Sequence, residues 1–324
     1  MPYRVLIVGL GQIGLSYDID LDPAFVYSHA RAFTQHPSFE LTGGVDSSEQ
    51  QQKLFSQTYN CPAYANLSDA LDHQSADVLI IAAPTPRHGA ILNQVLALSQ
   101  PKIILCEKPL SYELTEARTM VKACQEHGVA LYINYIRRSD AAVIEIRRRL
   151  ADGLIAMPVK GICWYSKGFL HNGSHFFNLL EYWLGPMQSA KPIDPGRLWD
   201  NTDPEPDVQV TFRDGNVVFV AAREESFSHY TIELVAANGR LRYEQGGQRV
   251  EWQAVEAGAI KGYRVLSSNV ETLPTGMNRY QFHVAEQIEL VLAGHEEHHL
   301  CSGAQALATL ESMHDILTLR DRTG

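Results

Sequence analysis

The chain has 324 residues, which is enough for about two domains with separate cores, and 45% of its residues are hydrophobic against 20% charged. A formal net charge of −10 argues against a nucleic-acid-binding surface. No apolar run approaches the roughly 20 residues of a membrane span, and no signal-peptide pattern precedes the first predicted strand. The five cysteines have no paired spacing and are typical of buried thiols in a reducing compartment. We expect a cytoplasmic protein that binds neither nucleic acid nor membrane.

The N-terminus carries an apolar, β-branched run, residues 5–8, that opens into a glycine-rich turn. Such a run predicts a buried parallel strand, and the turn predicts a passage into a helix. Gly9 permits the tight turn, Gly11 lets the backbone approach a pyrophosphate, and Gly14 lets the helix pack on the strand. Gln12 and Ile13 lie between the last two glycines and share the predicted phosphate-binding loop. The alternative is a glycine-rich turn without a ligand.

A second predicted strand, residues 39–45, ends at Asp46. A carboxylate at this point of a dinucleotide-binding fold accepts hydrogen bonds from the adenosine ribose hydroxyls and repels a 2′-phosphate. The sequence therefore favours NAD over NADP as cofactor.

The helix expected after the glycine loop is interrupted by the acidic segment 17–23, and a helical pattern resumes near residue 28. Asp18, Asp20 and Asp22 have the spacing of a calcium loop. Pro23 at the sixth position and His29 at the twelfth do not fit that motif, which needs Gly and Glu there. We expect a solvated insert beside the cofactor site and no metal site.

Strands and helices alternate as far as residue 133, which predicts a parallel sheet with helices on both faces. The pattern then changes to α+β, with a mostly antiparallel set of strands between residues 207 and 253 and two helices at the end. The predicted fold is an N-terminal Rossmann doubly wound sheet, residues 1–133, followed by an α+β domain with a largely antiparallel open sheet, residues 134–324.

Two turns follow predicted strands at the edge where ligands of parallel sheets bind. The first contains Thr85, Pro86 and His88, and the second contains Glu107 and Lys108. We expect Thr85, Pro86, His88 and Glu107 to line the nicotinamide half of the cofactor. Lys108 would bind a substrate hydroxyl or carbonyl. The alternative for Lys108 is a surface lysine in a turn that enters a helix.

A second polar constellation begins before the predicted helix 174–184. His171 precedes the helix, His175 lies in its first turn, and Asn178 lies one turn further on the same face. Asn172 follows His171 and is a further substrate-binding candidate. A neutral imidazole can accept a hydroxyl proton while hydride leaves the same carbon for NAD. A satisfied structural histidine is the alternative.

Together these motifs resemble the Gfo/Idh/MocA family of nicotinamide-dependent sugar and polyol dehydrogenases. The resemblance rests on the glycine loop, the Pro84–His88 turn, Glu107-Lys108-Pro109 and the helix that ends in Trp183-Leu184-Gly185. It implies a Rossmann domain and an α/β domain whose open sheet forms a homodimer or homotetramer face. It also implies that Lys108 orients substrate and that His175 takes part in proton transfer.

Two positions depart from the family pattern, since His171 and Asn178 stand where the family usually has aspartates. Either His171 joins the proton relay, or the chemistry is altered or lost. The segment 171–175 is also similar to family members found with surface-polysaccharide synthesis, which implies a nucleotide sugar. Our hypothesis is an NAD-dependent oxidoreductase acting on a secondary alcohol of a sugar or nucleotide sugar. The alternatives are a non-catalytic sensor or scaffold that binds NAD and sugar, and a reductase of a non-sugar carbonyl compound.

Overall fold

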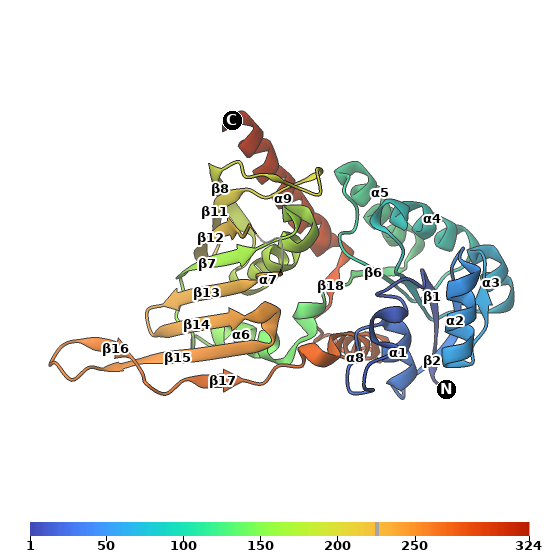
Figure 1. Ribbon diagram of the computed structural model, residues 1–324, viewed down its shortest axis with the longest axis horizontal. Coiled ribbons are helices and arrows are strands. Elements are labelled where there is room, and N and C mark those ends of the chain that lie inside the picture. The colour runs from blue at the N-terminus through green and yellow to red at the C-terminus, as the bar shows by residue number, and fades with distance from the viewer. Residues whose placement is uncertain (224–226, 324) are drawn as a thin grey trace. The chain divides into compact units, whose positions relative to one another are not determined.

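The computed structural model describes residues 1–223 and 227–323 (Figure 1). The chain forms two compact units. The first joins Met1–Ser139 to Asn278–Leu307, and the second joins Asp140–Met277 to Ala308–Gly324. A single boundary near residue 134 was expected, but the chain returns to the first unit late in the sequence. The reason is a strand and a helix from residues 278–307 that complete the sheet and the core of that unit.

The sheet of the first unit has the strand order β18-β6-β5-β4-β1-β2-β3. All neighbours are parallel except β18, which pairs antiparallel with β6. The order from β6 to β3 is that of a Rossmann fold, which confirms the predicted fold class. The strands are β1 (Tyr3–Val8), β2 (Phe39–Val45), β3 (Ala63–Tyr64), β4 (Val78–Ile81), β5 (Ile103–Cys106), β6 (Ala130–Ile133) and β18 (Cys301–Ser302).

Helices cover this sheet because its central strands are buried on both faces. Val5 and Ile7 of β1 share one hydrophobic core with Phe33 of α1 and with Val284 and Ile288 of α8. This packing is what draws the late helix α8 into the first unit. The helices are α1 (His29–Gln35), α2 (Glu49–Tyr59), α3 (Leu67–His73), α4 (His88–Leu98), α5 (Leu114–His127) and α8 (Tyr280–Leu292).

The second unit is built on a sheet in the order β16-β15-β14-β13-β7-β12-β11-β8, with β17 also paired to β15. Its neighbours are antiparallel apart from β7 and β12, so the predicted largely antiparallel sheet is confirmed. The strands are β7 (Val159–Tyr165), β8 (Met187–Asp194), β11 (Asp207–Phe212), β12 (Gly215–Ala221), β13 (Thr231–Ala236), β14 (Gly239–Glu244), β15 (Arg249–Ala257), β16 (Arg264–Leu266) and β17 (Glu271–Leu273). The helices are α6 (Ala141–Ala151), α7 (Ser174–Leu184) and α9 (Gly303–Thr323).

Strand β8 was not predicted from the sequence. It lies at the end of the strand order and includes Pro192, and proline is tolerated on edge strands because one side of the backbone needs no partner. The residues that follow form the short antiparallel pair β9 (Leu198–Trp199) and β10 (Asp203–Pro204). The proline-rich residues 192–206, where the sequence predicted no strand, therefore contain regular pairing.

The cysteines behave as expected, because all five are free and buried. Among the described residues, no helix combines the length and the apolar character that a bilayer span requires.

Candidate functional site

The glycine loop between β1 and α1 has a geometry that only glycine permits at two of its three positions. Gly9 has φ +100°, and a Cβ there would lie 2.6 Å from the carbonyl carbon of Ala82. A Cβ on Gly14 would lie 2.0 Å from the carbonyl oxygen of Gly9. Gly11 differs, since nothing among the described residues lies within 4 Å of its ideal Cβ. This open space beside Gly11 fits the close approach of a dinucleotide pyrophosphate.

Asp46 follows β2 and is hydrogen-bonded to the same loop. Its Oδ2 accepts from the backbone N–H of Leu10 at 2.8 Å, and its Oδ1 accepts from the N–H of Ser48 at 2.9 Å. Each carboxylate oxygen can accept a further hydrogen bond. Asp46 thus fixes the glycine loop and still has acceptor capacity for ribose hydroxyls.

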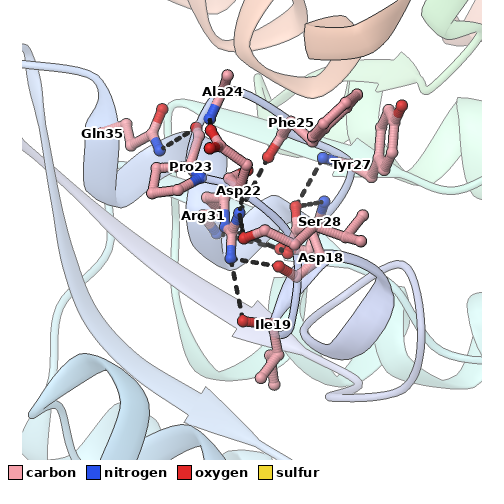
Figure 2. Close-up of polar contacts among 11 residues, drawn as sticks. Asp18, Ile19, Asp22, Pro23, Ala24, Phe25, Tyr27, Ser28, Arg31 and Gln35 are labelled. Carbon is pink, nitrogen blue, oxygen red and sulfur yellow. Dashed lines mark hydrogen bonds and ion pairs between the residues drawn. The ribbon is translucent and has the colours of Figure 1, made fainter.

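The insert after the glycine loop is not solvated throughout, so that expectation was wrong for its first aspartate. The Asp18 side chain is fully buried. Its carboxylate accepts from the N–H groups of Tyr27 and Ser28 at 2.6 and 2.7 Å and from the Ser28 hydroxyl at 2.7 Å (Figure 2). Arg31 forms an ion pair with the same carboxylate, with its Nε 3.5 Å from Oδ1. Acidic spacing alone did not reveal these partners because they lie 9 to 13 residues further along the chain.

Glu107, at the end of β5, is the centre of a buried polar cluster. The Nε2 atom of His29 lies 2.8 Å from its Oε1, and the Asn134 amide donates to the same oxygen at 2.6 Å. The Asn134 amide nitrogen also lies 3.2 Å from Oε1 of Gln281. Only 13% of the Glu107 side chain is exposed. Burial raises the pKa of Glu107, but the hydrogen bond and charge of His29, the Asn134 amide and the Lys108 charge outweigh it and lower that pKa overall.

Sequence reasoning did not find His29, Asn134 or Gln281 as members of this cluster. They come from the start of α1, the residue after β6 and the first turn of α8, so only the folded unit brings them to Glu107. The insert also hid His29, because it separates this histidine from the glycine loop in sequence. Lys108 is half-buried beside the cluster.

His88 was expected to line the cofactor, but its ring is fully buried. Its Nε2 lies 2.9 Å from the carbonyl oxygen of Ala83, and its Nδ1 lies 3.2 Å from that of Leu110. The ring therefore connects the turn after β4 to the turn after β5. Thr85 and Pro86 lie on the surface side of the first turn, half-buried and exposed respectively. Their contact with a cofactor stays a prediction.

In the second unit, a π-helical turn, Gly168–Gly173, leads directly into α7. Single π-helical turns are rare and occur frequently at functional sites. His171 lies in this turn, and its ring stacks on Trp199 with the centroids 5.1 Å apart. His175 lies in the first turn of α7 and is 9% exposed. The Asn172 amide donates to the Tyr230 hydroxyl at 2.7 Å.

Two carboxylates from the β10 region hold the backbone of the π-helical turn. Asp203 accepts from the N–H of Leu170 at 3.0 Å and from the N–H of His171 at 2.7 Å. Glu205 accepts from the N–H of Gly168 at 3.1 Å and from Nε of Arg197 at 3.0 Å. Burial raises the pKa of Asp203, as does the nearby Glu205 charge, and the backbone hydrogen bonds offset this only in part. Sequence reasoning did not identify either acid.

Asn178, expected on the same helix face as His175, is fully buried. Its amide donates to the Thr309 hydroxyl at 3.0 Å, and that hydroxyl donates to Glu181 at 2.5 Å. Asn178 therefore belongs to the packing of α7 against α9. The spacing placed Asn178 on the same face of α7 as His175, but spacing alone does not show that α9 packs against this part of the face.

The fold and the glycine loop define a Rossmann-type dinucleotide-binding protein. Residues 3–135 match the family model described as "Oxidoreductase family, NAD-binding Rossmann fold". Over these residues the chain is similar to the Gfo/Idh/MocA oxidoreductases, the family that the sequence motifs resemble.

Curated relatives and solved structures are similar to this chain over different lengths. The scyllo-inositol 2-dehydrogenase (NAD(+)) of Bacillus subtilis is 27% identical over 219 residues, which cover 61% of this chain and 58% of that protein. The D-apiose dehydrogenase of Paraburkholderia graminis is 26% identical over 146 residues, which cover 45% of this chain and 38% of that protein. The WlbA dehydrogenase of Bordetella pertussis, solved in complex with NADH and UDP-GlcNAcA, has a TM-score of 0.77 at 18% identity and covers 100% and 98% of the two chains. The last likeness shows the shared fold.

Within residues 1–223 and 227–323, no group of three or more His, Cys, Asp or Glu side chains is placed to hold a metal ion.

Proposed function

We propose that the protein is an NAD-dependent oxidoreductase that transfers hydride between the cofactor and a secondary alcohol of a sugar, a polyol or a nucleotide sugar. The observation that carries this proposal is the glycine loop, with open space at Gly11 and the Asp46 carboxylate at its side. The named activities of the inositol and apiose dehydrogenases support the reaction class. The nucleotide sugar in the WlbA complex supports a UDP-sugar as one substrate to test. A role in surface-polysaccharide synthesis rests on the resemblance of segment 171–175 to family members found with that synthesis.

In this proposal NAD supplies the hydride-accepting nicotinamide, and the chain supplies the groups that hold the substrate and move the proton. Lys108 binds the reacting oxygen and stabilises negative charge on it. A neutral ring nitrogen of His175 accepts the hydroxyl proton as the hydride leaves the same carbon, so a ketone and an imidazolium result. His171 assists this proton transfer in the proposal, and its hydrogen bond to Asp203 and its stacking on Trp199 are the contacts that would hold it.

Asp46 favours NAD over NADP in the same proposal. A 2′-phosphate on the ribose would lie against the Asp46 carboxylate, and this repulsion opposes NADP binding. The experiment is to follow absorbance at 340 nm with the purified chain, with NAD or NADP, and with a panel of polyols, free sugars and UDP-sugars. We expect NADH formation with one substrate class, lost in His175→Ala. Tight NAD binding without turnover across the panel would contradict the dehydrogenase proposal.

A sensor that binds NAD and sugar without hydride transfer is the second candidate. It is favoured by the residue types at positions 171 and 178, where histidine and asparagine stand in place of the carboxylates of the family pattern. The same titrations separate the two candidates, since a sensor would bind both ligands and leave the absorbance unchanged.

A further inference from the structure

Residues 17–28 form an insert in the first helix, and the hydrogen-bond register of the helix continues across this insert. In a continuous α-helix the carbonyl of residue i accepts from the N–H of residue i+4. The carbonyl of Ile13 instead accepts from the N–H of His29 at 2.9 Å, and that of Gly14 accepts from the N–H of Ala30 at 3.0 Å. His29 and Ala30 therefore occupy the places that residues 17 and 18 would take in an uninterrupted helix. The phosphate-binding loop and α1 form one helical unit from which the insert leaves and to which it returns.

The insert is held rigidly, although it is a loop. Its entry and exit are joined by Asp18, which binds the backbone and the hydroxyl of Ser28, the residue that caps α1. Arg31 donates to the carbonyl oxygens of Leu21 and Phe25 at 3.2 and 3.1 Å, and it also donates to that of Asp18. Figure 2 shows the Arg31 side chain directed towards Asp18 and the carbonyl group of Phe25. A loop with this many internal hydrogen bonds presents its side chains in fixed positions.

The insert is also fixed to the segment that leads into α8. The N–H of Val26 donates to the carbonyl of Asn278 at 2.9 Å, and the N–H of Gln281 donates to the carbonyl of Val26 at 3.3 Å. The ring of Tyr27 stacks on that of Tyr280, with the centroids 5.1 Å apart and the planes 22° apart. Gln281 belongs to the Glu107 cluster, so the insert is connected to the turn that carries Lys108.

Tyr17 is the first residue of the insert and adjoins the glycine loop. Its N–H donates to the carbonyl of Gln12 in the glycine loop at 2.9 Å, which fixes its backbone at the phosphate end. The insert ends at Ser28, and the next residue, His29, has its Nε2 atom 2.8 Å from Oε1 of Glu107, so the insert returns to the chain at the Glu107 cluster. The Tyr17 side chain is 48% exposed. An exposed aromatic ring with a hydroxyl is thus carried by a segment that runs from the glycine loop to the Glu107 cluster.

We propose that the insert 17–28 is a rigid cofactor-recognition element in which Tyr17 contacts the nicotinamide half of a bound dinucleotide. This inference rests on the proposed function only in requiring that the chain binds NAD. The glycine loop and Asp46 hold the phosphates and the adenosine ribose, and Tyr17 acts on the other half by packing its ring and offering its hydroxyl. Loss of Tyr17 should therefore weaken the binding of NADH and leave the binding of ADP-ribose, which lacks nicotinamide, unchanged.

The test measures the dissociation constants of NADH and ADP-ribose for the full chain by calorimetric titration. We expect Tyr17→Ala to weaken NADH binding roughly fivefold to tenfold, consistent with one aromatic contact. ADP-ribose binding should stay within about twofold. Leu21→Ala is the matched control, since Leu21 is a large side chain of the same insert that is 42% exposed and should leave both constants unchanged.

Equal weakening of both ligands in Tyr17→Ala, or NADH binding within about twofold of the wild type, would overturn the inference. A wild-type chain that binds neither ligand would instead overturn the proposed function. As a second variant, deletion of residues 17–28 joins Ser16 to His29 in the register that the hydrogen bonds of Ile13 and Gly14 define. We expect this variant to fold, to bind ADP-ribose as the wild type does, and to show the same selective loss for NADH.

Discussion

The contribution of the hydrogen bonds between Asp203 and the π-helical turn to stability can be tested by mutation. Asp203 is 7% exposed, and its carboxylate accepts from the N–H groups of Leu170 and His171. A buried amide left without an acceptor costs about 1–3 kcal/mol. Asp203→Ala leaves both amides without this acceptor and relieves the cost of burying the carboxylate, so we expect a net loss of about 2–3 kcal/mol in unfolding free energy. Asp203→Asn retains one acceptor oxygen and should lose about half of that.

The dependence on pH tests the same reasoning. Burial raises the pKa of Asp203, so the folded state holds its proton more tightly than the unfolded state does. The stabilisation that comes from this tighter proton binding is fully present below the pKa of Asp203 in the unfolded chain, about 3.9. It is lost as the pH rises through the higher pKa of Asp203 in the folded chain. The destabilisation by Asp203→Asn should therefore be larger at about pH 4 than at about pH 7.

Urea unfolding of the wild type and of Asp203→Asn, followed by circular dichroism at both pH values, gives the comparison. Asp200→Asn is the control, since Asp200 is exposed in the same segment and should change the unfolding free energy by less than about 0.5 kcal/mol. A destabilisation by Asp203→Asn that grows with pH would refute the assignment of a buried, proton-retaining carboxyl. In the 340 nm assay the variant should lower kcat more than it raises KM, because Asp203 positions the turn of His171 and does not itself bind substrate.

Three further outcomes are expected. Oxidation should speed up between about pH 6 and 8 as His175 becomes the neutral base, and a flat profile would remove His175 from that role. His29→Ala should raise the pKa of Glu107 and lower the unfolding free energy by about 1–3 kcal/mol, and His29→Gln, which can still donate, should recover part of this in thermal unfolding. The outward face of the second sheet carries the paired, half-buried side chains Ile162 and Val218, with Trp164 beside them. If this face forms the expected dimer or tetramer, Trp164→Glu should shift the sedimentation of the chain to that of a monomer.

Local patterns in the sequence predicted most of the elements correctly. The continuous apolar runs of β1, β4 and β5 are fully buried strands of a parallel sheet, as expected from a period that leaves no polar face. The glycine loop was also predictable, because the tight turn requires residues without a Cβ at positions 9 and 14, and this requirement is local in sequence. Edge strand β8 escaped prediction because its residues are largely solvent-exposed and include a proline.

Residues of the candidate site were predictable only where the end of a secondary-structure element fixes their location. The position of Asp46 beside the glycine loop was predictable because Asp46 follows a strand, and the carboxyl ends of parallel strands meet at one edge of the sheet. His88 and Asn178 were assigned by the same kind of reasoning, yet the structure places their polar atoms against Ala83, Leu110 and Thr309. A buried polar group takes whichever partner the fold brings to it, and spacing along one helix or turn does not name that partner.

The sequence by itself therefore determined the Rossmann start of this protein, its likeness to an NAD-binding oxidoreductase family over residues 3–135, and the residue types available for chemistry. Only the tertiary structure decided that Asp18 closes the insert, that His29 and Asn134 bind Glu107, and that Asp203 holds the turn of His171. The physical reason is the distance in sequence between the residues that interact. Strand periodicity and glycine turns depend on neighbours a few residues away, whereas each of these buried carboxylates is satisfied by donors that only folding brings within hydrogen-bonding distance.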